Sequence, residues 1–147
     1  SKGVYDMHGT LAWDDKFKAL LSMPYIASVV LHDRACWLDQ FEPARVQDKA
    51  VGDFARDRVK VFADAGIQGT AALVEIKTTA GVTHTDRRLV AKGDAADPLS
   101  RAEIQCKLRT AASGVISNAA VDRIITLVDG LEQLGNVREL LDAVRAG

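Results

Sequence analysis

Residues 69–109 constrain the fold more than any other stretch, because they combine two strands, a turn, a polar linker and a capped helix. The first strand, Thr70–Lys77, alternates its apolar positions. Gly81 is free to adopt the positive φ of a tight turn, and the return strand extends over Val82–Lys92. Because helices flank this hairpin in sequence, we expect them to cover its apolar face. The residues expected to be buried there are Ala72, Val74 and Ile76.

The C-terminal third is expected to be helical. Ser100 and Glu103 form the S-x-x-E pattern of a capping box, which opens a helix that ends at residues 113–114. A last helix is expected over residues 136–145. The helix between these two carries the clearest apolar stripe in the chain, formed by Val121, Ile124, Ile125, Val128, Leu131 and Leu134.

The N-terminal half mixes helical and extended patterns. The β-branched residues of Ser22–Asp33 would permit a buried strand, but Ser22 as a cap and Pro24 in the first turn favour a buried helix. We predict that Phe41–Arg58 contains a second helix, which starts near Pro43 and has its alternating charges in solvent, and that Arg58–Asp64 forms a short strand. This order predicts one α+β domain over residues 1–147, with a small, mainly antiparallel sheet of three to four strands packed with flanking helices.

Charge and hydropathy exclude several classes of partner. The 147 residues carry a formal net charge of −1, so no basic surface argues for nucleic acid or an acidic membrane. The longest apolar run, Ile26–Leu31, is far too short to span a bilayer. Cys36 and Cys106 do not form a disulfide framework, which favours a reducing environment. We therefore expect a cytoplasmic protein that binds neither nucleic acid nor membranes.

Spacing alone identifies no reaction centre. Asp14 and Asp15 resemble paired carboxylates, but neighbouring residues on a helix point in different directions, which favours a solvated first turn. His32, Asp33 and Cys36 suggest a metal site or a nucleophile. With three histidines in the chain and no second cluster, we favour a helix end with a C-terminal histidine, and we expect no metal site. Physical reasoning stops at an α+β domain.

Three motifs, in this order, carry a family resemblance. They are Ser22–Leu31 (SMPYIASVVL), Lys92–Ser100 (KGDAADPLS, followed by Ile104–Leu108) and Leu131–Leu140 (LEQLGNVREL). They resemble the S-L-P-Y helix, the K-G-x-(x)n-(N/D)-P-L-S linker with its following K-F, and the closing L-E-x-L-D-D-V-R-E-L of the MmgE/PrpD family. The resemblance covers nearly the whole chain but only the C-terminal domain of that family.

The resemblance implies a domain of a longer enzyme. In the family, a large helical domain precedes this smaller α+β domain, which forms a lid over the substrate cleft between the two. Its members are cofactor-independent lyases and isomerases of small di- or tricarboxylates, such as 2-methylcitrate dehydratase. Most catalytic histidines and lysines belong to the helical domain, which is absent from these residues, so we do not expect this chain to be catalytic alone.

Tyr25 is the one candidate catalytic residue, by its place in the S-x-P-Y motif. From the residues alone, it is either a core tyrosine with a satisfied hydroxyl or a phenol that opens into a cleft. A phenol with a reference pKa of about 10 stays protonated at neutral pH and can donate to a developing negative charge. We expect Tyr25→Phe to lower the activity of the complete enzyme with little loss of stability.

Two departures from the family pattern lie near this tyrosine. Residues 20–21 are Leu-Leu where the family often has a basic residue and an aromatic, and Asp33 is followed by Arg34 where the family commonly has Asp-Gly. Because both departures lie close to the expected substrate cleft, the resemblance does not identify the particular substrate.

Three functions therefore remain as hypotheses: the lid domain of such an enzyme, a non-catalytic module that binds small carboxylates, and a structural or dimerisation domain. The expected partners are a small di- or tricarboxylate, the helical domain in cis or in trans, and a second copy of this chain. No cofactor is implied.

Overall fold

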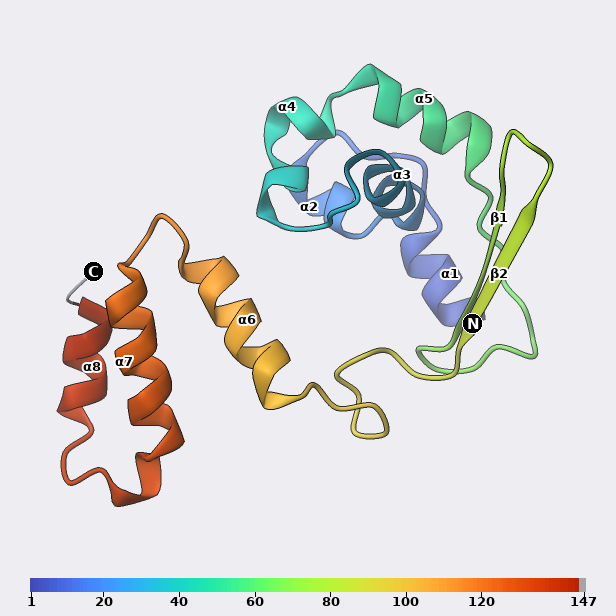
Figure 1. Ribbon diagram of the computed structural model, residues 1–147. Coiled ribbons are helices and arrows are strands. Elements are labelled where there is room, and N and C mark those ends of the chain that lie inside the picture. Colours follow the sequence, from blue (N-terminus) through green and yellow to red (C-terminus); the bar gives the residue numbers. More distant parts are fainter. Residues whose placement is uncertain (146–147) are drawn as a thin grey trace. The chain divides into compact units, whose positions relative to one another are not determined.

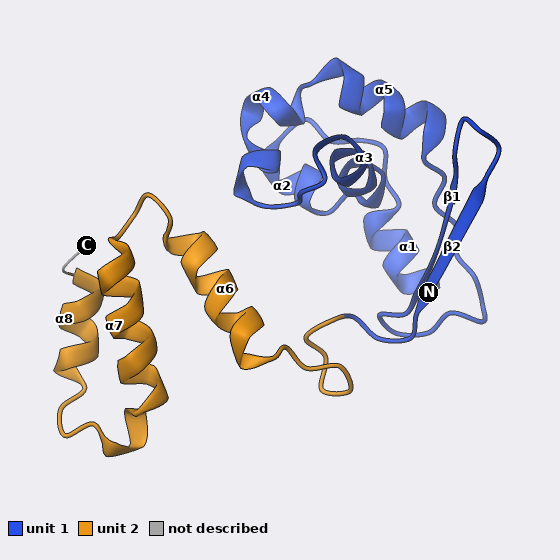
Figure 2. Cartoon of the chain, viewed as in Figure 1, with its two compact units in different colours: residues 1–91 blue, residues 92–147 orange. Residues whose placement is uncertain are grey.

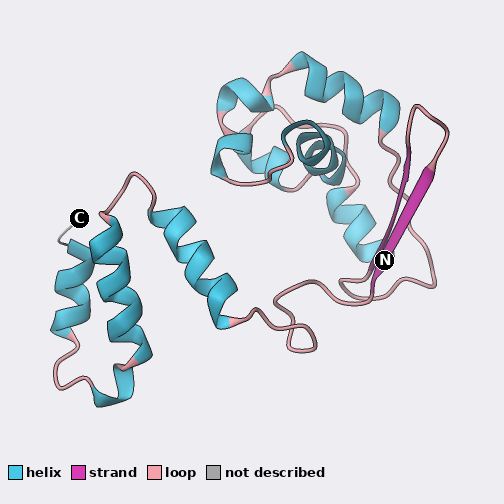
Figure 3. Ribbon diagram, in the orientation of Figure 1, coloured by secondary structure: helices cyan, strands magenta, loops and turns pink. Residues whose placement is uncertain are grey.

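The computed structural model describes residues 1–145, and its backbone divides into two compact units that meet in sequence between Ala91 and Lys92 (Figures 1 and 2). Helices predominate, and the strands form a single hairpin (Figure 3). The protein is therefore of the α+β class, as expected. That residues 1–147 act as one domain stays a prediction.

The first unit begins with helices. Its helical elements are α1 (Lys2–His8), α2 (Lys16–Leu20), α3 (Met23–Asp33), a 3-10 helix (Leu38–Phe41), α4 (Pro43–Val46) and α5 (Lys49–Arg58). The Ser22 hydroxyl accepts a hydrogen bond from the Tyr25 N–H at 3.3 Å, and Pro24 occupies the first turn of α3. The buried helix favoured over a strand for this segment is confirmed.

The hydrophobic core of this unit surrounds α3, which packs against α5 and α2 (Figure 1). Trp13 and Ile26 lie at its margin, partly buried. Its buried members are Ala19, Tyr25, Val29, Phe41, Val46 and Val51. These helices therefore cover one another's apolar faces.

The single helix predicted over Phe41–Arg58 is divided in the structure. Pro43 begins α4, and Asp48 begins α5, because its carboxylate accepts a hydrogen bond from the Ala50 N–H at 2.8 Å. The cap at Asp48 therefore starts a new helix, although the apolar stripe in the sequence continues through this position.

The predicted hairpin is confirmed, but its strands are shorter than expected: the return strand, predicted to extend to Lys92, ends at Arg88. Strands β1 (Ala72–Lys77) and β2 (Thr83–Arg88) are antiparallel, with Ala72 opposite Arg88 and Lys77 opposite Thr83. Gly81 has a φ of 82°, as expected for the turn residue.

Two expectations about the sheet are not met. The sheet has two strands within residues 1–145. Arg58–Asp64, expected to be a further strand, forms none, because Arg58 ends α5 and residues 59–64 lie outside regular structure. Burial of the apolar face of β1 is also contradicted, because every residue of both strands is exposed. On that face the exposed fractions of Val74 and Ile76 are 52% and 40%.

The composition of β2 explains why no described helix of the first unit covers this face. The residues opposite Ala72, Val74 and Ile76 are Arg88, Asp86 and His84. A helix packed there would have to desolvate a row of polar and charged groups together with the apolar row, and burial of unpaired charges is unfavourable. The helices of the unit instead pack around α3.

The second unit contains α6 (Arg101–Ala112), α7 (Asn118–Asp129), a 3-10 helix (Leu131–Gln133) and α8 (Arg138–Arg145). The capping box at Ser100 and the helix end at residues 113–114 are confirmed, since Ser113 is the C-cap of α6 and Gly114 has a φ of 75°. Ion pairs also join its helices; they are Arg101–Asp129, Arg109–Asp122 and Arg123–Glu139.

Little apolar surface is buried in this unit. The helix predicted to carry the apolar stripe ends at Asp129, before Leu131 and Leu134. Val121 and Ile124 of this stripe are buried, whereas Val128 and Leu131 are about half exposed, at 50% and 48%. No described helix combines the length and the apolar character that crossing a bilayer requires.

Candidate functional site

Tyr25 lies at the centre of the first unit rather than at its surface. It stands in the first turn of α3 with an exposed fraction of 0%. The Trp13 ring meets it edge-on at a centroid distance of 5.4 Å, and the Phe41 ring lies tilted against it at 5.8 Å. Aromatic pairs in these arrangements stabilise a core beyond the area they bury.

The Tyr25 hydroxyl donates a hydrogen bond to the carbonyl oxygen of Gln40, in the 3-10 helix. Burial raises the pKa of Tyr25 to about 12, so the phenol is neutral at physiological pH and serves as a donor. This is the geometry of a core tyrosine with a satisfied hydroxyl. In this arrangement the phenol is closed to solvent, and the Gln40 carbonyl occupies its hydrogen bond.

Asp33, at the last turn of α3, organises the segment that carries this acceptor. Arg45 of α4 makes a bidentate contact with the Asp33 carboxylate, with its Nε at 3.1 Å. The Gln40 amide donates to the same carboxylate at 3.2 Å and accepts a hydrogen bond from the Trp37 N–H at 2.9 Å. Asp33 therefore fixes the turn that receives the Tyr25 hydroxyl.

Asp48 completes this network, since its carboxylate accepts a hydrogen bond from the Arg45 guanidinium at 2.5 Å. The hydrogen bond from Arg45 holds the pKa of Asp33 below its ordinary value. The pKa of Asp48 is also lowered, chiefly by the hydrogen bond from the Ala50 N–H. Both groups are therefore ionised at neutral pH. Their arrangement suits positioning of the turn better than proton transfer.

Sequence reasoning assigned Arg45 and Asp48 to a solvated face. In the structure the exposed fractions of their side chains are 24% and 34%; Arg45 contacts Asp33 of α3, and Asp48 contacts Arg45. Asp33 occupies the place of the Asp in the Asp-Gly pair that commonly ends this helix in the family. That match could have indicated a carboxylate with a structural role. No spacing rule predicted its arginine partner from the following helix.

The other candidate residues have structural partners. The Asp15 carboxylate caps α2 by accepting from the Lys18 N–H at 2.8 Å, and Asp14 pairs with the Lys18 ammonium at 2.6 Å. The solvated first turn favoured for these aspartates is confirmed. The His32 ring meets Phe54 edge-on at 5.0 Å.

The structure does not join His32 and Cys36 into a nucleophile pair. Nδ1 of His32 lies 2.8 Å from the carbonyl oxygen of Ser28, and burial raises the pKa of the Cys36 thiol. A raised pKa lowers the fraction of reactive thiolate at neutral pH. Among residues 1–145, no three His, Cys, Asp or Glu side chains gather as a group that could hold a metal ion.

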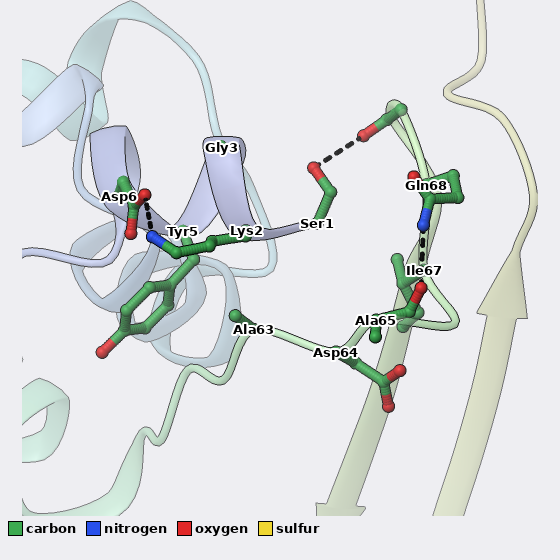
Figure 4. Close-up of a pocket in the computed structure, with 11 residues that line it drawn as sticks. Ser1, Lys2, Gly3, Tyr5, Asp6, Ala63, Asp64, Ala65, Ile67 and Gln68 are labelled. Atoms are coloured by element: carbon green, nitrogen blue, oxygen red, sulfur yellow. Dashed lines mark hydrogen bonds and ion pairs between the residues drawn. The ribbon is translucent and has the colours of Figure 1, made fainter.

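A shallow groove with a volume of about 690 Å³ lies between α1 and the loop of residues 63–69 (Figure 4). Lys2 and Asp6 on its α1 side form an ion pair at 2.5 Å, and the Ser1 hydroxyl donates to the Gly69 carbonyl oxygen at 3.4 Å. Tyr5 also lines it. The groove contains none of the residues singled out from the sequence and no base placed beside a nucleophile.

The Lys92–Ser100 motif builds a cap for α6. Gly93 has a φ of 97°, and its N–H donates to the Asp97 carbonyl oxygen at 2.8 Å. The Lys92 ammonium lies 3.1 Å from the Asp97 carboxylate and 3.5 Å from that of Glu103. The Glu103 carboxylate in turn accepts the Ser100 N–H at 2.7 Å. The motif therefore has a structural role within this unit.

These observations define a small α+β protein in which the motif residues hold backbone segments in place. The sequence profile of the MmgE/PrpD C-terminal domain matches residues 2–133, and the chain belongs to that family. The resemblance drawn from the three motifs, and its restriction to the C-terminal domain, are thereby confirmed. The chain matches no curated protein.

Proposed function

We propose that the chain is the C-terminal lid domain of a cofactor-independent lyase or isomerase of small di- or tricarboxylates, with an activity like that of 2-methylcitrate dehydratase. The observation that carries this proposal is the family match over residues 2–133, which includes the S-x-P-Y motif at the start of α3. The chain supplies Tyr25 and the lid, and a helical domain supplies the remaining catalytic groups.

In this proposal Tyr25 donates a hydrogen bond to a substrate carboxylate or to the negative charge that forms beside it. The raised pKa supports this role, because a phenol with a pKa of about 12 stays protonated across the working range. The Gln40 carbonyl takes this hydrogen bond in the free chain. The helical domain, when it closes on the lid, has to draw the 3-10 helix away from Tyr25.

Exposed apolar side chains in the second unit support the proposal that this chain contacts a further domain. In the second unit Val128, Leu141 and Val144 are each about half exposed, at 50%, 51% and 53%. Apolar surface of this kind is typical of a contact with another domain or subunit. The expected third strand belongs to the same proposal, with residues 58–64 pairing with β1 once the neighbour is bound. Cytoplasmic residence, supported by the free Cys36 and Cys106, is also part of it.

The mass of the native protein in its source cells tests this proposal. We expect an antibody to this domain to detect a product well above 15.8 kDa, or a complex of the 15.8 kDa chain with a separately encoded helical partner. A native chain of 15.8 kDa without such a partner would exclude the lid function.

Tyr25→Phe, made in that complete enzyme, tests the chemistry. We expect kcat/KM for a tricarboxylate substrate to fall about a hundredfold to a thousandfold, the range for loss of one donor to developing negative charge. Because the hydroxyl is buried and bonded, we also expect a stability loss of about 1–2 kcal/mol, more than the sequence suggested. Phe41→Leu, which alters the same core without removing a donor, is the control. Unchanged kcat/KM would leave Tyr25 a core residue.

The burial of Tyr25, with its hydroxyl bonded to the Gln40 carbonyl, argues against a catalytic role in the free chain, so the second candidate is a non-catalytic module that binds small carboxylates. Calorimetric titration of the isolated chain with citrate distinguishes the two. Binding without turnover, by a native chain that has no helical partner, would favour the module.

A further inference from the structure

The outer edge of β2 presents unused backbone hydrogen-bonding groups. The Thr78 N–H donates to the Val82 carbonyl oxygen at 2.8 Å, so this pair at the turn is hydrogen-bonded. In an antiparallel ladder, hydrogen-bonded and non-hydrogen-bonded pairs alternate. The backbone groups of His84, Asp86 and Arg88 therefore point toward β1. Those of Thr83, Thr85 and Arg87 point away from the sheet.

Outside the ladder with β1, no hydrogen bond described for residues 1–145 includes the backbone of Thr83, Thr85 or Arg87, and both strands are exposed along their whole length. A two-stranded hairpin without a covering helix is only marginally stable, and a further strand stabilises it. β2 contains no proline or lysine, which commonly block an open edge, but it carries the charges of Asp86, Arg87 and Arg88, so a partner strand has to be complementary to them.

The side chains of β2 are complementary to themselves in one register. Two copies related by a two-fold axis perpendicular to the sheet place each outward-pointing residue opposite another such residue. With Thr85 opposite Thr85, His84 of each copy lies opposite Asp86 of the other in a non-hydrogen-bonded pair, where side chains approach most closely. Farther from the axis on either side, Thr83 of each copy lies opposite Arg87 of the other. Thr–Thr pairs and pairs of a donor with a carboxylate are favourable in this position.

We propose that the outer edge of β2 binds β2 of a second copy of this chain, antiparallel and with Thr85 on the two-fold axis, to form a continuous four-stranded sheet. An imidazole N–H of His84 donates to the Asp86 carboxylate of the other copy. That carboxylate also contacts Arg88 of its own strand at 3.3 Å, and a carboxylate has acceptor sites for both.

The competing registers are less favourable. The other symmetric register through the middle of β2 places Asp86 opposite Asp86, and like charges directly opposite destabilise a pair. On the edge of β1, the two symmetric registers through the strand's middle place Glu75 opposite Glu75 or opposite Leu73. In these two registers the Glu75 carboxylate faces no hydrogen-bond donor, whereas in the register centred on Ile76 it lies opposite Lys77. The side chains therefore select this register on the β2 edge, and the proline variants below distinguish that edge from the edge of β1.

The oligomeric state of the full 147-residue chain, measured by sedimentation over a range of concentrations, tests this pairing. We expect a monomer–dimer equilibrium that Thr85→Pro abolishes, because proline removes the outward N–H at the centre of the interface. Glu75→Pro is the matched control. Glu75 lies opposite Thr85, and its N–H points out of the sheet at the β1 edge, away from the proposed interface. It should perturb the hairpin equally and leave the dimer. A chain that stays monomeric, or equal loss of the dimer in both variants, would overturn the proposal.

A charge exchange tests the register. His84→Asp alone should weaken the dimer about tenfold, because a carboxylate then faces Asp86 in two symmetric pairs. The double variant His84→Asp with Asp86→His restores complementary pairs and should recover the dimer. If His84→Asp has no effect, or the double variant is no better than the single one, the proposed register is wrong.

Discussion

Arg34 carries the clearest local strain in the chain. It ends α3 with a φ of 55°, the one positive φ recorded for a non-glycine residue among residues 1–145. A left-handed backbone places Cβ too near the following carbonyl oxygen, and glycine avoids this contact. The family commonly has glycine here, so the departure noted in the sequence lies at a position where the backbone favours glycine.

Arg34→Gly should therefore stabilise the first unit. We expect the free energy of unfolding to rise by about 1 kcal/mol, which tryptophan fluorescence in urea measures. Arg34→Ala, which removes the same side chain but retains Cβ, is the control and should give no such gain. Equal stabilisation by both variants would mean that the guanidinium, and not the backbone, is unfavourable.

The carboxylate of Asp33 predicts a pH dependence. Its pKa is lowered in the folded protein by the hydrogen bond from Arg45, so its contribution to stability is complete above the unfolded-state pKa near 4. That contribution is lost as the pH falls through the lower, folded-state pKa.

Asp33→Asn should accordingly destabilise the chain by about 1–2 kcal/mol at pH 7, because a charged hydrogen-bond acceptor is removed. The difference from the unaltered chain should shrink below pH 4, as the native carboxylate is itself protonated. Urea unfolding at pH 7 and pH 3 measures both values. Asp39→Asn, on the neighbouring 3-10 helix but outside the Arg45 contact, is the control. A difference that is the same at both pH values would exclude an electrostatic origin.

At the scale of elements, the beginning of α6 depends on its capping box. The Ser100 hydroxyl accepts from the Glu103 N–H at 3.3 Å, while the Glu103 carboxylate accepts the Ser100 N–H at 2.7 Å. Ser100→Ala should cost about 1 kcal/mol of helix stability, seen in circular dichroism during urea unfolding. Ser113→Ala, at the opposite end of α6, should cost less. Equal effects would show that the box does not determine where α6 begins.

Elements with a local cause were predictable from the sequence. The caps at Ser22 and Ser100 and the turn at Gly81 lie where expected, because each depends on a few neighbouring residues. The burial of Val74 and Ile76 was wrong, since it depended on what β2 places opposite them. Periodicity within one strand does not report the composition of its partner.

The candidate site shows the same limit. The place of Tyr25 in the first turn of a buried helix followed from Ser22 and Pro24. Its acceptor did not, because the Gln40 carbonyl belongs to a turn fixed by the contact of Asp33 with Arg45. Contacts between side chains on different helices have no local sequence signal.

At the scale of the whole molecule, the two units differ in the core that each contains. The first unit buries a continuous cluster around α3, including Tyr25, Val29 and Val51 at 0% exposure. The buried apolar residues described for the second unit are Ala112, Val121, Ile124 and Ala143. Because stability follows the apolar area removed from water, the second unit should unfold first.

The distribution of tryptophan makes this difference measurable in the full chain. Both tryptophans, Trp13 and Trp37, belong to the first unit, whereas helices in both units contribute to circular dichroism. We expect circular dichroism to report a transition at lower urea than tryptophan fluorescence, contrary to the coincidence that two-state unfolding requires. As a control, Val115→Trp in a Trp13→Phe, Trp37→Phe background should move the fluorescence transition to the lower urea concentration. Coincident transitions in the unaltered chain would instead show that residues 1–147 unfold as the single cooperative domain that the sequence suggested, with the small core of α6 to α8 stabilised by the rest of the chain.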